Sequence, residues 1–203
     1  MLQNEDKKKL EGYVDKLIDG LKRETEKAKS NGTSGEKLIE KVTNMTVSKL
    51  TPESKMILSS AYNMMMEHTL AEDYFADSAH KAAFYGADIL KELTSKFDFA
   101  VPSEISYEKS NTEVSKMMAA GAVVVVGGIV SITLKSWIPI GIAAVIAGIM
   151  AFVLKNTAGA APVKNVDVVI NEYYASVKKS LLTWVDSIDA YYDKAVSEIK
   201  ERG

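Results

Sequence analysis

The side chains best suited to acid–base chemistry or metal binding lie between residues 67 and 80. They are two histidines and four carboxylates, namely Glu67, His68, Glu72, Asp73, Asp77 and His80. On a continuous helix Asp73, Asp77 and His80 would share one face, because residues three and four apart meet on a helix surface. A carboxylate-bridged metal site in a bundle needs two Glu-x-x-His motifs and two further glutamates. Neither histidine stands in that motif, so we interpret the cluster as a solvated helix face and expect no metal and no cofactor.

Other chemistries find even less support in the 203 residues. The sequence has no Walker loop, no GxGxxG turn and no GxSxG nucleophile elbow. It contains no cysteine, which excludes disulfides, thiolate catalysis and cysteine-based zinc sites. The formal net charge of -2 gives no electrostatic case for nucleic acid, which needs a clustered basic surface. We therefore expect neither an enzyme nor a binder of small-molecule substrates or nucleic acid.

The elements that hold these residues are predicted to be amphipathic helices. In the first, apolar residues recur at spacings of three and four, as a helix with one buried face requires: Leu10, Tyr13, Val14, Leu17, Ile18 and Leu21. Asn4 is its expected N-cap, and residues 30–35 form the loop that ends it. Leu38, Ile39, Val42 and Met45 mark a second helix. Thr51 and Pro52 suit a new helix start, with Thr51 as N-cap.

From Pro52 to Phe97 the pattern predicts one long helix, or two that join near Glu67–Ala76. A last helix is predicted from Asn165 to about Lys200, roughly 50 Å long. Its expected apolar stripe is Val166, Ile170, Tyr173, Tyr174, Val177, Leu181, Trp184, Val185, Ile188, Tyr191, Ala195 and Ile199. No segment shows a strand pattern. The fold class is therefore all-α: a bundle of amphipathic helices around or beside an apolar helical hairpin, with a long C-terminal helix.

That hairpin is the most unusual feature of the sequence. Residues 117–154 contain a single charge, Lys135. Two apolar arms, Met117–Leu134 and Ile138–Leu154, have 18 and 17 residues. A helix needs about 20 apolar residues to cross a bilayer, with a lower limit near 17, so both arms are short but sufficient. A connection of only three residues makes the arms antiparallel.

Particular residues are expected to carry membrane insertion. Lys135 and Trp137 at the tip suit the lipid–water interface, and Pro139 opens the second arm. Small residues allow the two arms to pack closely. The predicted insertion residues are Met117, Met118, Gly121, Val125, Gly127, Gly128, Ile132, Lys135, Trp137, Pro139, Ile142, Ala144, Ala147, Gly148, Ala151 and Leu154.

Three domains follow from this pattern: amphipathic helices over 1–116, the membrane-competent hairpin over 117–154, and a linker with the long helix over 155–203 that packs on the first domain. Residues 1–9 lack the apolar stretch of a Sec signal peptide. The leading interpretation is a membrane-inserting protein, pore-forming or membrane-perturbing, with the lipid bilayer as partner. It would be soluble before insertion and would associate with itself or with related helical subunits.

Two alternatives stay open. A constitutive protein with two spans could anchor a scaffold or adaptor to a membrane, with both polar parts on one side. A soluble interaction bundle could instead bury the hairpin in its own core, since central helices of large bundles can be apolar all round.

The order of segments resembles that of the α-helical pore-forming toxins. Amphipathic helices precede the short-armed hairpin at 117–154, and a long amphipathic helix follows it. Colicin pore domains hide an apolar hairpin within a soluble bundle, and toxins of the cytolysin A and haemolysin BL type carry a membrane-active head between long helices. The resemblance implies an all-α fold and pore formation by oligomers. It concerns the plan alone, because the hairpin is not near the C-terminus as in colicins and the helices are shorter than in the cytolysins.

Overall fold

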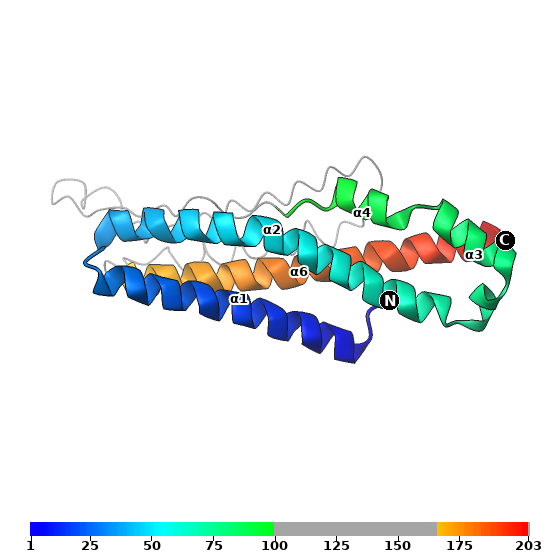
Figure 1. The fold of residues 1–203 in the computed structure, drawn as a ribbon, viewed down its shortest axis with the longest axis horizontal. Helices are drawn as coiled ribbons and strands as arrows, with labels where there is room; N and C mark the ends of the chain where they lie inside the picture. The colour runs from blue at the N-terminus through cyan, green and yellow to red at the C-terminus, as the bar shows by residue number, and fades with distance from the viewer. Residues whose placement is uncertain (100–165, 203) are drawn as a thin grey trace, which may run out of the picture.

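The computed structural model describes residues 1–99 and 166–202. Of these residues 89% are helical and none forms a strand, which confirms the predicted all-α class. Three long helices, α1 (Asn4–Ser30), α2 (Gly35–Leu70) and α6 (Val166–Arg202), run side by side. In Figure 1 α2 and α6 run in the same direction and α1 runs opposite to both.

Helix α1 has the predicted buried face. Leu10, Val14, Leu17, Ile18 and Leu21 are all buried. The predicted cap is wrong, because the helix begins at Asn4 and the residue before it, Gln3, makes no capping hydrogen bond through its side chain. A tight turn then reverses the chain into α2. Gly32 and Gly35 take φ values of +83° and +58° there, a region that costs glycine little.

Helix α2 passes through Pro52 without a break, so the predicted restart at Thr51 is wrong. Proline removes one backbone hydrogen bond from a helix interior, and here its side chain is exposed. The hydroxyl of Thr51 turns back and donates to the carbonyl of Val47 at 2.7 Å instead of capping a new helix. Leu50 and Ile57 on the opposite face are buried. Their packing on both sides of the proline favours one continuous helix over the local start signal.

The chain breaks after Leu70, within the region predicted for a junction. A short 3₁₀ helix, η1 (Asp73–Ala76), leads into α3 (Ser78–Gly86) and α4 (Ile89–Lys96). The second break, between α3 and α4, was not predicted. It falls at Asp88, a residue other than glycine with a positive φ of 46°. These short elements contact the C-terminal part of α6, where Phe84 meets the ring of Tyr192 edge-on.

Helix α6 has 37 residues, which corresponds to about 55 Å. It contacts α1, α2, α3 and α4. At the start of the helix Val169 is buried while the predicted Val166 is only partly so, but the stripe follows the prediction from Ile170 to Ile188. Beyond that point Tyr192 and Val196 are buried, while Tyr191 and Ala195 are only partly so. The buried side chains of α1, α2, α4 and α6 form one contiguous apolar core.

Candidate functional site

The predicted insertion residues, Met117 to Leu154, lie outside the described residues, as does the hairpin itself. Among residues 1–99 and 166–202, no helix has the length and apolar character that crossing a membrane requires. The described part of the chain therefore shows how the residues that flank 100–165 are packed, and which polar groups join the helices of the bundle.

The sequence cluster of carboxylates and histidines does not form one face. Asp73 lies in η1, whereas the Asp77 side chain caps α3 by accepting from the backbone N–H of Ala79 at 2.7 Å. Backbone hydrogen bonds of this kind lower the pKa of Asp77. His80 lies in α3, where its ring stacks on Tyr74 with centroids 4.0 Å apart. The prediction of a shared face is wrong because the helix ends at Leu70, and no potential metal-binding group of three ligands occurs in the described ranges.

His68 instead belongs to a polar cluster that joins α1 to α2. Its Nε2 lies 2.6 Å from Oδ2 of Asp6, a carboxylate in the first turn of α1 that is only 5% exposed. Nε2 of Gln3 lies 3.2 Å from Nδ1 of the same ring. With the amide so placed, Gln3 donates to Nδ1, which leaves Nε2 to carry the proton toward Asp6. Sequence reasoning missed this contact, because the two residues are 62 positions apart and form no motif.

Opposing effects set the charge state of Asp6. Burial raises its pKa, but the hydrogen bond and charge of His68 and the nearby Lys9 ammonium together lower the pKa below the usual 3.8. Asp6 therefore stays ionised in the folded protein at neutral pH. A buried carboxylate with these partners joins two helices and holds them in a defined register.

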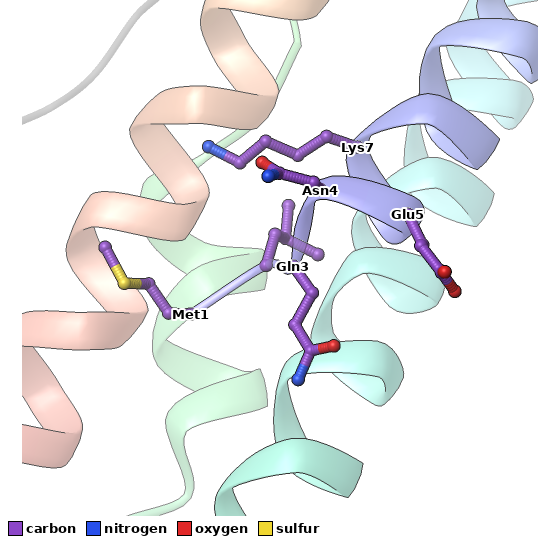
Figure 2. A pocket seen from close by; sticks show the side chains of 6 residues that line it. Met1, Gln3, Asn4, Glu5 and Lys7 are labelled. Atoms are coloured by element: carbon purple, nitrogen blue, oxygen red, sulfur yellow. The ribbon is translucent and has the colours of Figure 1, made fainter.

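A second buried carboxylate, Asp189 of α6, fastens the N-terminal residues from the other side. Its Oδ1 accepts the backbone N–H of Leu2 at 2.7 Å, and its Oδ2 lies 3.1 Å from the ammonium of Lys7. The hydrogen bond with Asp189 raises the pKa of Lys7. Figure 2 shows Lys7 extending from α1 toward α6, beside a hollow lined by Met1, Gln3, Asn4 and Glu5. Leu2 is buried, so the first residues act as a hook that ties α1 to both neighbouring helices.

This cluster has the components of a clasp between helices. An acid–imidazole pair needs a nucleophile or a substrate proton within hydrogen-bond reach to do chemistry. In the described part of the chain, the hydrogen-bond partners of His68 are Asp6 and Gln3, and neither is a hydroxyl or a thiol. Its evident effect is to hold three helices together at one place.

The described residues on either side of the segment 100–165 both contact other parts of the bundle. Before it, Phe99 is 5% exposed and packs on Trp184 with ring centroids 5.3 Å apart. After it, Asp167 in the first turn of α6 forms an ion pair with Lys29 at 2.7 Å. Seventeen residues separate Asp167 from Trp184, so the two points lie about 26 Å apart along the helix. Phe99 was not singled out in the sequence, although an aromatic residue beside a proline-containing break is a usable sign of an anchored chain end.

The buried face near these points also contains unusual polar groups. Tyr174 OH lies 2.8 Å from Oγ1 of Thr25, and Tyr192 OH donates to Oγ1 of Thr69 at 3.0 Å. Burial raises the pKa of Tyr192 to about 12, and that of Tyr173 to about 12. Trp184 is 2% exposed, and its indole N–H has no hydrogen-bond partner among the described residues.

Comparisons of the chain with protein-family models, with curated proteins and with solved structures found no match. The fold defines the chain as an all-α bundle, and any functional conclusion depends on its own residues.

Proposed function

We propose that this chain is a membrane-inserting helical protein of the pore-forming or membrane-perturbing kind, with residues 117–154 as its insertion element. One observation carries the proposal. A stretch of 38 residues with a single charge lies between two chain ends that are both held on one folded helical bundle. The bilayer is the solvent in which such a stretch is most stable.

The apolar composition of the arms favours their transfer from water into lipid. Burying apolar surface is favourable by roughly 25 cal/mol for each Å², and a helix satisfies its own backbone hydrogen bonds in lipid. The described helices support the proposal because they form a core of their own. Their buried apolar side chains form one contiguous core, so the bundle has the means to remain folded when the arms enter lipid.

Self-association is part of the proposal, because the arms alone offer little to line a pore. Ser131 and Thr133 are the only hydroxyl-bearing residues within the arms. A conducting path would therefore need lipid headgroups or amphipathic helices from several copies of the chain. The small residues of the arms, such as Gly128 and Gly148, suit close contact between helices in lipid.

Dye release from liposomes tests the proposal directly, with charge placed at different depths. Val125→Asp and Ile146→Asp put a carboxylate near the middle of an arm, at a cost of roughly 2.5–3.5 kcal/mol for insertion. Ser136→Asp adds the same charge at the tip, where water and headgroups solvate it. We expect the first two variants to lose leakage while Ser136→Asp retains most of it. Folded mid-arm variants with full leakage would contradict the proposal.

A second experiment uses the absence of native cysteine, which makes any introduced cysteine unique. A polarity-sensitive dye attached at Val125→Cys or Ile146→Cys should brighten on addition of liposomes and be quenched by lipid-borne quenchers. The same dye at an exposed position of α1, Lys16→Cys, is the matched control and should change little. If the fluorescence of the dyes at positions 125 and 146 does not change when liposomes are added, the soluble-bundle alternative is favoured. A protein that resists extraction from its source membrane but releases no dye would favour the two-span anchor.

A further inference from the structure

One stretch of α2, between the exposed carboxylates Glu40 and Glu67, differs from α1 in the charges of its solvent face. From Lys41 to Asn63 its exposed charged residues are all lysines, and the exposed residues between them are polar or, at Pro52 and Met56, apolar. The single carboxylate in this stretch, Glu53, is half-buried and accepts a hydrogen bond from Tyr13. We name this surface the α2 cationic strip and define it by Lys41, Asn44, Ser48, Lys49, Lys55 and Ser59.

Helical spacing places most of the strip along one line. Lys41, Ser48 and Lys55 follow at intervals of seven, which brings them back to the same side of the helix with a drift of about 20° for each interval. The distance from Lys41 to Lys55 along the axis is about 21 Å. Lys49 lies to one side of this line, next to Met56, whose side chain is 57% exposed.

These three lysines have no carboxylate partner within the described ranges, unlike many others in the protein. Lys7, Lys29, Lys178 and Lys200 each form ion pairs with carboxylates from other parts of the bundle. Lys8, Lys16 and Lys22 on the outer face of α1 are also unpaired, but Glu5, Glu11, Asp19 and Glu24 are exposed on the same helix. The chain has a net charge of -2, so attraction to an anion requires such a local excess of cations.

The position of the strip is also informative. The turn at Gly32–Gly35 and the Lys29–Asp167 ion pair place the start of α2 beside the start of α6. The strip therefore lies toward the end of the bundle at which α6 begins, where α1, α2 and α6 run side by side (Figure 1).

We propose that the α2 cationic strip is the surface on which the protein docks, with α2 parallel to the membrane plane, onto a bilayer that contains anionic lipid headgroups. The inference rests on the proposed function and names the membrane that the insertion element meets. Lysine ammonium groups attract the anionic headgroups, while serine and asparagine side chains hydrogen-bond phosphate oxygens. Each lysine near such a surface strengthens binding about fivefold. Docking holds the bundle against lipid before residues 117–154 insert.

Co-sedimentation of the full chain with vesicles tests the inference. The vesicles are phosphatidylcholine alone, or phosphatidylcholine with roughly a third phosphatidylserine. The test variant combines Lys41→Gln, Lys49→Gln and Lys55→Gln. The control combines Lys8→Gln, Lys16→Gln and Lys22→Gln, which lowers the net charge equally on the outer face of α1. Circular dichroism and thermal unfolding verify that both variants fold, as expected for exposed, unpaired lysines.

We expect the unmodified chain to bind the anionic vesicles far more tightly than the neutral ones. The strip variant should bind anionic vesicles about a hundredfold more weakly, and the control only a few-fold more weakly. Equal losses in both variants, or none in the strip variant, would overturn the inference. So would equal binding of the unmodified chain to both kinds of vesicle.

The same assay separates this inference from the proposed function. Val125→Asp that binds anionic vesicles normally but releases no dye would support docking as a step before insertion. A strip variant that binds and releases dye like the unmodified chain would overturn the docking surface while leaving insertion intact. An unmodified chain that binds neither kind of vesicle would overturn both.

Discussion

Because Asp6 is buried and His68 is partly exposed, we expect His68→Ala to lower the free energy of unfolding more than Asp6→Asn does. His68→Ala removes the main partner of a carboxylate that is 5% exposed and leaves it with Lys9, whose Nζ is 3.5 Å away and largely in solvent. Breaking a fully buried ion pair costs about 3–5 kcal/mol. Because the His68 side chain is 33% exposed, water can partly replace it, and we expect a loss of about 2 kcal/mol. Alanine is a better helix former than histidine by a few tenths of a kcal/mol, so the measured loss is a lower bound on the contribution of the contact.

Asp6→Asn should cost less, about 1 kcal/mol, because the histidine that remains reaches solvent and the asparagine still fills the site. Urea unfolding at pH 7 of both single variants and of the double variant gives the coupling between the two residues. The double variant should lose less than the sum of the single losses, by about 1 kcal/mol. Gln3→Ala is the matched control and should change stability by less than about 0.5 kcal/mol.

The pH dependence has a definite sign. The pKa of Asp6 is lower in the folded protein than its usual 3.8, so the unfolded chain binds more protons in this range. The stabilisation is therefore present above about pH 5 and is lost as the pH falls through the lowered pKa. Between pH 7 and pH 5 the cost of Asp6→Asn should persist, and below the folded pKa it should shrink. A His68→Ala variant as stable as the parent at pH 7, or additive single losses, would refute the view of this contact as a clasp.

Three further predictions follow from the fold. Pro52→Ala should raise the free energy of unfolding by about 1–3 kcal/mol, because it restores a hydrogen bond inside α2, and a lower urea midpoint would contradict this. Phe99→Ala should expose Trp184 and shift its fluorescence to longer wavelength, measured with Trp137→Phe so that one tryptophan remains; unchanged emission would mean that Phe99 does not cover the indole. Because burial raises the pKa of Tyr173 and Tyr192 from 10.0 to about 12, both phenols favour folding below pH 10 and lose this contribution between pH 10 and 12. Absorbance titration should therefore detect tyrosines that ionise only as the protein unfolds, and full ionisation near pH 10 with retained helix would be the contrary result.

The sequence predicted the long helices better than their breaks. A stripe repeated over several turns, as in α1, leaves little freedom, because each turn must present an apolar side chain to the same core. The predicted helix start at Pro52 was wrong because it relied on local sequence alone. The packing of Leu50 and Ile57, which only the tertiary structure shows, keeps the helix continuous. The burial of Tyr192 in place of Tyr191 has a geometric cause. A straight α-helix has 3.6 residues per turn, so side chains seven residues apart do not point in quite the same direction. Over a long helix this difference accumulates, and the buried position shifts by one residue.

The polar clasp could not be predicted from the sequence, for a different reason. Asp6, His68 and Asp189 come from three helices and share no motif, so only the register of the bundle brings them together. One signal was present. Asp189 lies four residues after Val185 and three before Tyr192, which are both buried, so a carboxylate interrupts an otherwise apolar face. A charged residue at such a position predicts a buried partner, although not its identity.

The geometry of the two attachment points leads to a prediction about how insertion proceeds. Residues 100–116 and 155–165 connect the bundle to the proposed arms, and extended chains of these lengths reach at most about 56 Å and 36 Å. The attachment points themselves lie about 26 Å apart along α6. The connecting segments are therefore long enough for residues 117–154 to enter a bilayer while α1, α2 and α6 remain packed. Hydrogen exchange with and without liposomes tests this. Amides of the buried stretch Tyr173–Ile188 should keep their protection in the membrane-bound protein, since their core is shared with α1 and α2. If these amides exchange rapidly once lipid is bound, insertion dismantles the bundle, and the hook at Leu2 and Asp189 would be a contact that must break first.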